Sequence, residues 1–131
     1  MTITPWGDSA VTIEFDARID PAINDRVVAL AEAIEHRAIP GVRDVVPTFR
    51  SVTVYFDPLK TDWSVLMEHL EGESARVDAV SARLLRVVRI PVCYGGVHGP
   101  DLGAVAALAG LDESGVIALH VGTVYPVFML G

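Results

Sequence analysis

The sequence is poor in cysteine and lysine, with one of each among its 131 residues. A single cysteine excludes an internal disulfide framework. Cys93 lies in an apolar run, which is typical of a buried structural thiol rather than of a reactive nucleophile. Lys60 has no glycine-rich loop before it, so the sequence lacks the P-loop that holds a nucleoside triphosphate.

Positive charge is also scarce, and no Lys or Arg follows Arg89. The net charge of −7 arises within residues 1–80, because residues 81–131 carry equal numbers of acidic and basic side chains. A nucleic-acid surface needs clustered positive charge, so we expect no nucleic-acid partner. The segment 102–131 is largely apolar, with Asp112 and Glu113 as its charged residues, and it suits burial against more protein because it would favour aggregation if exposed.

Long hydrophobic runs are absent, although 51% of the residues are hydrophobic. No apolar run reaches the roughly 18 residues that a membrane span requires, so we expect no membrane partner. The N-terminus lacks the basic region and apolar core of a signal peptide, which predicts a cytoplasmic protein. The four histidines lie far apart, and Cys93 with His98 offers at most two ligands, so we expect no metal site.

What the sequence does contain is the hydrophobic patterning of an α+β protein. Asp20 and Pro21 are typical of a helix N-cap and first turn. Alternation of apolar and polar residues predicts strands, whereas apolar residues three or four positions apart predict helices. The predicted order is strand 10–15, helix 21–38, strands 42–46 and 51–56, helix 62–71 and a β-rich run over 84–94. This β-α-β-β-α-β order is typical of the split βαβ, ferredoxin-like fold.

Two details of this pattern concern the second helix. Its apolar face is expected to bury Trp63, Leu66, Met67 and Leu70, and Gly72 is expected just beyond its end. The polar stretch 73–82 is predicted to be a linker. Beyond it, the pattern predicts helices over 101–109 and 112–120 and a strand over 124–130.

The stretch from Ile90 to Leu102 reads IPVCYGGVHGPDL. Paired glycines allow positive φ and a close backbone approach, so Gly95 and Gly96 form either an amide nest for an anion or a plain tight turn. As a string, the stretch closely resembles the signature of one family. Its members are known as allophanate hydrolase subunit 1, as the B subunit of 5-oxoprolinase, as sporulation-kinase inhibitors and as carboxyltransferase domains C and D.

The resemblance extends over nearly the whole chain and keeps the family's order. It includes segments at residues 7–10, 39–42, 45–47, 50–51, 55–59, 116–120 and 125–131. Three positions depart from the family pattern: Val97 and Gly115 replace acidic residues, and Pro126 interrupts a strand-like segment. Family members continue beyond the segment that ends here at Gly131, so the sequence resembles a shortened member.

The resemblance implies a fold, a function and partners. Residues 1–82 would form the ferredoxin-like domain, with 84–90 as a candidate strand to complete its sheet, and residues 83–131 the opening part of a cyclophilin-like β-barrel. The chain would be a non-autonomous subunit of an amide or lactam hydrolase, either ATP-dependent 5-oxoprolinase or allophanate hydrolase. It would act with a homologous second subunit, and a third subunit is a further candidate. The alternative is a binding protein that inhibits a sensor histidine kinase.

Six residues are the candidate site. His120 and Tyr125 are the candidate catalytic residues, and Tyr94, Gly95, Gly96 and Asp101 the candidate substrate-binding residues. His120 follows a helix whose dipole favours a protonated imidazole, so it is either a general base or hydrogen-bond donor, or a histidine bonded to a helix-end carbonyl. The tyrosines either present hydroxyls to a pocket or fill a core, and Asp101 suits the first turn of a helix.

Overall fold

A computed structural model of the chain describes residues 1–77 and 87–130. The chain divides into two compact units, Met1–Leu84 with Val127–Gly131, and Leu85–Pro126. Its described part is an α+β structure with one four-stranded antiparallel sheet and four α-helices. The domain boundary predicted at residue 82 lies outside the described residues.

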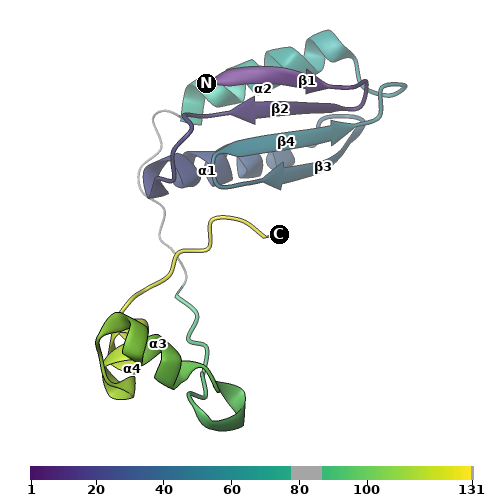
Figure 1. The fold of residues 1–131 in the computed structure, drawn as a ribbon. Helices are drawn as coiled ribbons and strands as arrows, with labels where there is room; N and C mark the ends of the chain where they lie inside the picture. The colour runs from purple at the N-terminus through teal and green to yellow at the C-terminus, as the bar shows by residue number, and fades with distance from the viewer. Residues whose placement is uncertain (78–86, 131) are drawn as a thin grey trace. The chain divides into compact units, whose positions relative to one another are not determined.

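The sheet of the first unit has the strand order β1-β2-β4-β3 (Figure 1). Its strands are β1 (Thr2–Trp6), β2 (Ala10–Glu14), β3 (Val42–Pro47) and β4 (Ser51–Phe56). The helix α1 (Pro21–Arg37) connects β2 to β3, and β4 lies between these two strands, which makes a split βαβ unit. The strands predicted from the alternating pattern are therefore confirmed, with ends that differ by one residue.

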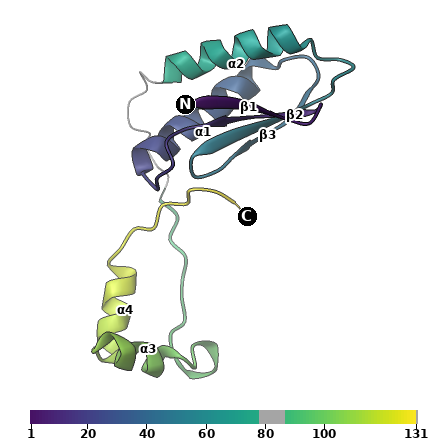
Figure 2. The ribbon, with the colours of Figure 1, turned by 45° about the horizontal axis from the view of Figure 1, so that its top comes forward.

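Two helices, α1 (Pro21–Arg37) and α2 (Trp63–Val77), cover one face of the sheet (Figures 1 and 2). Asp20 caps α1 as predicted, and its carboxylate accepts a hydrogen bond from the Ala22 amide at 2.9 Å. The predicted apolar stripe of α1 is buried against the sheet, which confirms the face: Ile23, Val27, Leu30, Ala31 and Ile34.

The strand β1 is an element that the sequence pattern did not reveal. It pairs with β2 and forms one edge of the sheet. Pro5 interrupts the alternating pattern, but an edge strand tolerates proline because one row of its backbone groups has no partner. A short turn with Gly7 at φ 64° joins the two strands, so this local pairing closes with little loss of chain entropy.

The second helix also differs from its prediction. It continues through Gly72 to Val77, so the predicted stop at Gly72 is wrong and residues 73–77 of the expected linker are helical. Tertiary burial explains the extension, because Glu73, Ser74 and Val77 are buried against the rest of the unit. Trp63 was expected in the core, yet it is 44% exposed. Residues 78–82 of that linker lie outside the described part.

The second unit contains the 3-10 helix η1 (Gly96–His98), α3 (Leu102–Ala109) and α4 (Glu113–Val121). Its two predicted helices are confirmed, but its described residues form no strand. The predicted strands are wrong over 87–94 and 124–130, whereas residues 84–86 fall outside the description. Strands need a hydrogen-bonding neighbour, and Pro126 lacks the N–H that a ladder requires.

Most side chains of the second unit are exposed in the described residues. Leu108 and Leu119 on the two helices are largely exposed, and so is Cys93, which corrects its prediction as a buried thiol. No apolar layer covers the segment around Cys93 in the described structure, although its neighbours in sequence are apolar. Within the part described, no single helix could span a membrane; α3 and α4 together have the length and composition, but they bend by 89°.

Candidate functional site

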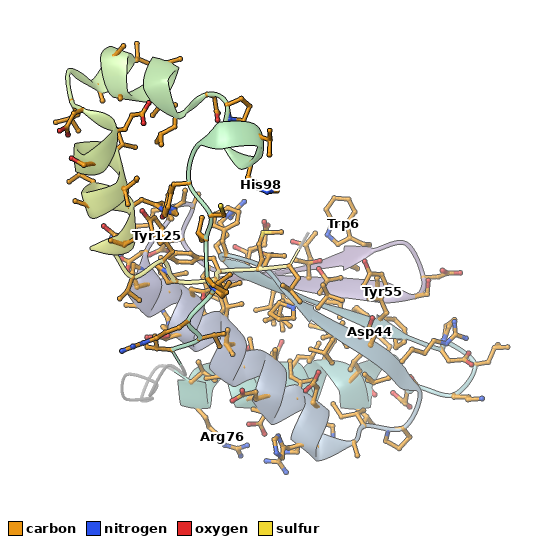
Figure 3. All side chains as sticks on the ribbon, turned by 90° about the horizontal axis from the view of Figure 1, so that it is seen from below. Trp6, Asp44, Tyr55, Arg76, His98 and Tyr125 are labelled. Carbon is orange, nitrogen blue, oxygen red and sulfur yellow. The ribbon has the colours of Figure 1, made fainter. Side chains whose placement is uncertain are left out.

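Three rings meet in the second unit, all from the candidate site (Figure 3 labels one of them, Tyr125). The Tyr94 hydroxyl is hydrogen-bonded to Nδ1 of His120. Their rings make an edge contact with centroids 5.7 Å apart and planes at 81°. The Tyr125 ring also contacts His120, with a centroid separation of 5.4 Å. The structure thus brings together Tyr94, His120 and Tyr125 from positions up to 31 residues apart in the sequence.

The helix α4 positions His120, which lies in its last turn. The helix begins at Asp112, whose carboxylate accepts hydrogen bonds from the Gly115 amide at 2.7 Å and the Ser114 hydroxyl at 2.9 Å. The bond from the Gly115 amide, followed by that from Ser114, lowers the pKa of the Asp112 carboxyl below its usual value of 3.8. The cap therefore stays negatively charged at neutral pH and stabilises the helix that carries His120.

A tight glycine loop follows Tyr94. Gly95 and Gly96 have φ values of 73° and 58°, which confirms the expectation of positive φ. The Gly99 amide donates to the Gly95 carbonyl at 3.1 Å, and a Cβ on Gly99 would lie 2.8 Å from the Gly95 nitrogen. Glycine is therefore required at Gly95 by conformation and at Gly99 by space. The geometry supports a tight turn and leaves its anion-binding role as a prediction.

Asp101 stands apart from the three rings. It occupies the N-cap position of α3, but its side chain does not cap that helix. Among the described residues, its carboxylate makes no hydrogen bond to Tyr94, His120 or Tyr125. Its contact with a substrate therefore stays a prediction, because its carboxylate makes no hydrogen bond to the three rings.

The cluster offers proton-transfer and hydrogen-bonding groups rather than a covalent nucleophile. His120 is exposed, and Tyr125 is 60% exposed, so both can reach a ligand from solution. An imidazole beside two phenols can polarise or protonate an amide carbonyl oxygen or leaving nitrogen. No group of three potential metal ligands occurs among the described residues.

Sequence spacing alone could not have revealed the contact between the three rings. Tyr94 and His120 are 26 positions apart, and Tyr94 lies outside the helices and strands.

The family model for the carboxyltransferase domain, subdomain C and D, matches residues 1–131. The chain belongs to this family. This membership confirms the resemblance carried by the string from Ile90 to Leu102.

Relatives of this carboxyltransferase-domain chain include the B subunits of two bacterial 5-oxoprolinases. The protein from Bacillus subtilis (strain 168) is 35% identical over 98% of this chain and 58% of its own length. The protein from Escherichia coli O157:H7 is 33% identical over 95% of this chain and 56% of its own length. The chain therefore spans a little over half the length of these relatives.

The chain is also similar to solved structures. The uncharacterized protein PH0987 from Pyrococcus horikoshii is 38% identical, with a TM-score of 0.55 over 99% of this chain and 59% of its own. TTHA0988 is 34% identical with a TM-score of 0.77, over 93% of this chain and 23% of its own. The N-terminal domain of the histidine kinase inhibitor KipI from Bacillus subtilis is 28% identical, with a TM-score of 0.50 over 58% of this chain and 85% of its own.

Proposed function

We propose that the chain is a non-autonomous subunit of an amide or lactam hydrolase, most closely of the 5-oxoprolinase type. The observation that carries this proposal is the Tyr94–His120–Tyr125 cluster in a chain whose relatives are 5-oxoprolinase B subunits. Hydrolysis of an unactivated lactam needs stabilisation of the oxygen that becomes negative as water adds. The cluster supplies groups of this kind on an exposed surface.

His120 is the proposed catalytic residue, and Tyr94 sets its tautomer. A phenol that donates to Nδ1 leaves the hydrogen of the neutral imidazole on Nε2, which then points a donor away from Tyr94. That N–H would bind the lactam carbonyl oxygen as the oxygen of a water molecule bonds to the carbonyl carbon. The C–N bond would then break, and a proton from that water would pass to the nitrogen, which leaves as an amine. Tyr125 would contact the same substrate beside the imidazole. Gly95, Gly96 and Asp101 would form the outer part of the substrate site.

The remaining parts of the active site would come from partners. The sequence has no P-loop, and we propose that ATP binds to a homologous second subunit. The exposed apolar surface of α3 and α4 supports an interface with further protein. The partner is either that second subunit or the rest of a cyclophilin-like barrel, whose opening part we propose for residues 83–131. A third subunit is a further candidate partner, and allophanate an alternative substrate.

The experiment compares 5-oxoproline turnover by the chain alone and after mixing with its second subunit, with and without ATP. We expect no turnover by the chain alone and ATP-dependent turnover in the complex. In the complex, His120→Ala should lower kcat by about 100-fold or more, as expected for loss of a donor to an oxyanion. His98→Ala is the matched control, because His98 is also exposed in the second unit.

Two results would contradict the proposal. Robust turnover by the isolated chain would exclude a site shared between subunits. Unchanged kcat in the His120→Ala complex would return His120 to the role of a histidine at a helix end. Thermal unfolding of each variant separates a loss of chemistry from a loss of folding.

A second function has its own support. The chain is similar over 58% of its length to the N-terminal domain of the histidine kinase inhibitor KipI, so inhibition of a sensor histidine kinase is the alternative proposal. Autophosphorylation of a cognate kinase, measured with increasing amounts of this chain, distinguishes the two. Stoichiometric inhibition would favour the binding protein, whereas no effect at excess chain would favour the enzyme subunit.

A further inference from the structure

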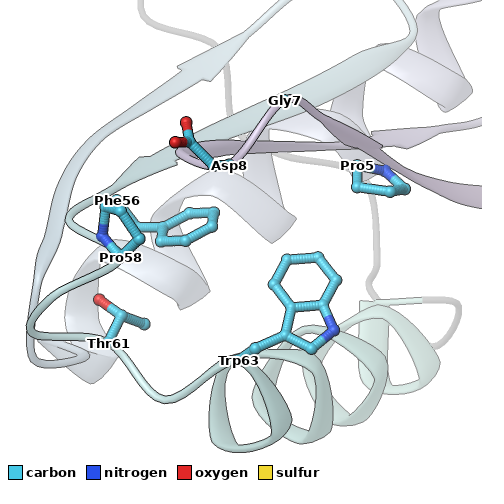
Figure 4. Close-up of a pocket in the computed structure, with 7 residues that line it drawn as sticks. All are labelled: Pro5, Gly7, Asp8, Phe56, Pro58, Thr61 and Trp63. Atoms are coloured by element: carbon cyan, nitrogen blue, oxygen red, sulfur yellow. The ribbon is translucent and has the colours of Figure 1, made fainter.

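The first unit has two features that the proposed function does not use. One is a hollow of about 330 Å³ between the β1–β2 turn and the start of α2 (Figure 4). The buried Phe56 ring packs against Trp63 there, with centroids 5.9 Å apart, so the two rings leave no enclosed space between them. The other is the buried carboxamide of Asn24 on α1, which bonds to two distant parts of the chain.

Asn24 is the one carboxamide side chain in the sequence, which contains no glutamine and no other asparagine. It lies in the first turn of α1 and is only 8% exposed. A buried amide costs free energy unless its hydrogens are bonded. Its Nδ2 donates to the Thr48 carbonyl at 3.1 Å and to the Phe128 carbonyl at 2.9 Å, which uses both hydrogens. Carbonyl oxygens only accept, so the nitrogen of the amide must face them.

The first of these carbonyls belongs to a fixed turn between β3 and β4. The Thr48 amide donates to the Ser51 carbonyl at 2.7 Å, and the Ser51 amide donates to the Thr48 hydroxyl at 3.1 Å. The two hydroxyls also bond to each other at 2.8 Å. These bonds keep the Thr48 carbonyl in place, so it orients the Asn24 amide in advance for its second partner.

The second carbonyl belongs to a segment with little other support. Residues 124–130 form no helix or strand, and Val127 and Leu130 are largely exposed. Among the described residues of this segment, the Phe128 carbonyl makes the one hydrogen bond. The bond from Asn24 is therefore the polar contact that holds the segment on the first unit, to which Phe128 belongs.

The connection from the anchored Phe128 carbonyl to Tyr125 of the candidate site is short and stiff. It consists of Pro126 and Val127. The proline ring fixes the φ of Pro126 and restricts the residue before it, here Tyr125, to extended backbone conformations. A stiff connection transmits a constraint along the chain, whereas a flexible one would absorb it. Pro126, one of the three departures from the family pattern, has a physical use in this connection.

We propose that Asn24 is a positioning residue for Tyr125. By holding the Phe128 carbonyl, and through the stiff backbone at Pro126, it narrows the range of positions that the Tyr125 ring samples. The ring then spends more of its time in contact with His120, at the centroid separation of 5.4 Å. A consequence for substrate binding rests on the proposed function of the cluster, whereas the positioning of the ring does not.

Nuclear magnetic resonance of the ¹⁵N-labelled full chain tests the anchor directly, because the single carboxamide gives a single side-chain NH2 signal pair. We expect nuclear Overhauser contacts from this pair to both Thr48 and Phe128. Its hydrogens should exchange with solvent at least about tenfold more slowly than those of a free amide, since both are bonded and buried. A pair that contacts Thr48 but not Phe128 overturns the proposal.

Two variants test the effect on the Tyr125 ring. Asn24→Leu removes both donors, and Pro126→Gly makes the connection flexible at an exposed residue outside the core. Each should weaken the Overhauser effect between the Tyr125 and His120 rings by about threefold or more, as loss of one net hydrogen bond allows. Ala22→Leu is the matched control, because Ala22 is exposed in the same turn of α1. Unchanged ring contacts in either variant overturn the proposal, and Pro126→Gly decides alone if Asn24→Leu does not fold.

Kinetics of the complex with the second subunit separate this role from that of His120. Asn24→Leu and Pro126→Gly should raise KM for 5-oxoproline by about threefold to tenfold and change kcat less, because the Tyr125 ring would bind substrate and His120 would stabilise the oxyanion. The parent KM in an active complex of both variants overturns the proposal. If the parent complex has no activity toward 5-oxoproline, the proposed function fails, and the ring contacts still decide the role of Asn24.

Discussion

At the scale of single residues, stability depends on side chains that meet between the sheet and its two helices. Val11, Val27, Val52 and Leu66 are completely buried there, together with Ile34 on α1 at 1% exposed. A charge in such a layer has no partner and no water. Each of these side chains also contacts neighbours from several elements, so one substitution is felt across the unit.

The substitution Ile34→Asp should lower the free energy of unfolding by roughly 3–5 kcal/mol, because it buries a polar group and removes apolar contacts. Ile19→Asp introduces the same change where the side chain is 78% exposed, and it should change the free energy of unfolding by less than about 0.5 kcal/mol. Chemical denaturation of both variants provides the measurement. Equal effects at the two positions would show that the α1 face is wrongly placed.

Two glycines of the first unit make a second residue-scale comparison. A Cβ would meet nothing within 4 Å at either Gly7 or Gly72, but Gly7 has a φ of 64° and Gly72 lies inside α2. Gly7→Ala should therefore destabilise by about 1 kcal/mol, and Gly72→Ala should stabilise by about 0.5–1 kcal/mol. Thermal unfolding midpoints that move in opposite directions would bear this out, and a shift of the same sign would refute it.

At the scale of elements, an ionic network joins the two helices that cover the sheet. Glu73 on α2 has a side chain only 9% exposed, and its Oε1 lies 2.7 Å from both Arg37 of α1 and Arg76 of its own helix. The side chains of Arg37 and Arg76 are 47% and 65% exposed. Each contacts the same carboxylate oxygen directly, so either arginine alone keeps Glu73 paired. The network couples the last turn of α1 to the segment of α2 beyond Gly72.

A double-mutant cycle tests this coupling. Arg37→Met and Arg76→Met should each cost less than about 1 kcal/mol, because the remaining arginine still pairs with Glu73. The double variant should cost at least about 0.5 kcal/mol more than the sum, since it leaves a largely buried carboxylate without a cation. The free energies of unfolding come from urea denaturation. Additive effects would mean that the two arginines do not substitute for each other as partners of Glu73.

At the scale of the whole molecule, the two units differ in how much core they contain. The first unit has a contiguous cluster of buried apolar residues from its sheet and both helices. In the second unit, Ala106 is the one buried residue among those described. The hydrophobic effect therefore stabilises the first unit by itself, whereas the apolar side chains of the second unit remain available for further contacts.

This difference predicts the behaviour of fragments. Residues 1–77 should unfold cooperatively, with a thermal midpoint within a few degrees of the full chain. A fragment of residues 1–72, ending at the glycine that the sequence pattern selected, should unfold at least about 5 °C lower. It lacks Ser74 and Val77, which are buried in the unit. Circular dichroism measures both midpoints, and an unfolded 1–77 fragment would show that the first unit needs the rest of the chain.

Only part of the candidate site could be predicted from the sequence. The helix carrying His120 and the glycine turn at Gly95 follow from local signals, namely an N-cap, a turn residue and helical periodicity. That Tyr94, His120 and Tyr125 meet does not follow, because contacts between distant positions depend on the packing of α4 and the loops around it. The exposure of Trp63 was missed because the helical pattern places that side chain inward.

The sequence by itself determined the elements whose signals are local. The cap at Asp20, the apolar stripe of α1 and the alternating strands β2 and β4 were predictable, because each depends on residues within a few positions. Tertiary structure decided β1 at the sheet edge, the extension of α2 to Val77 and the exposure of Cys93. Strand pairing and burial are long-range contacts, so propensity along the chain cannot determine them.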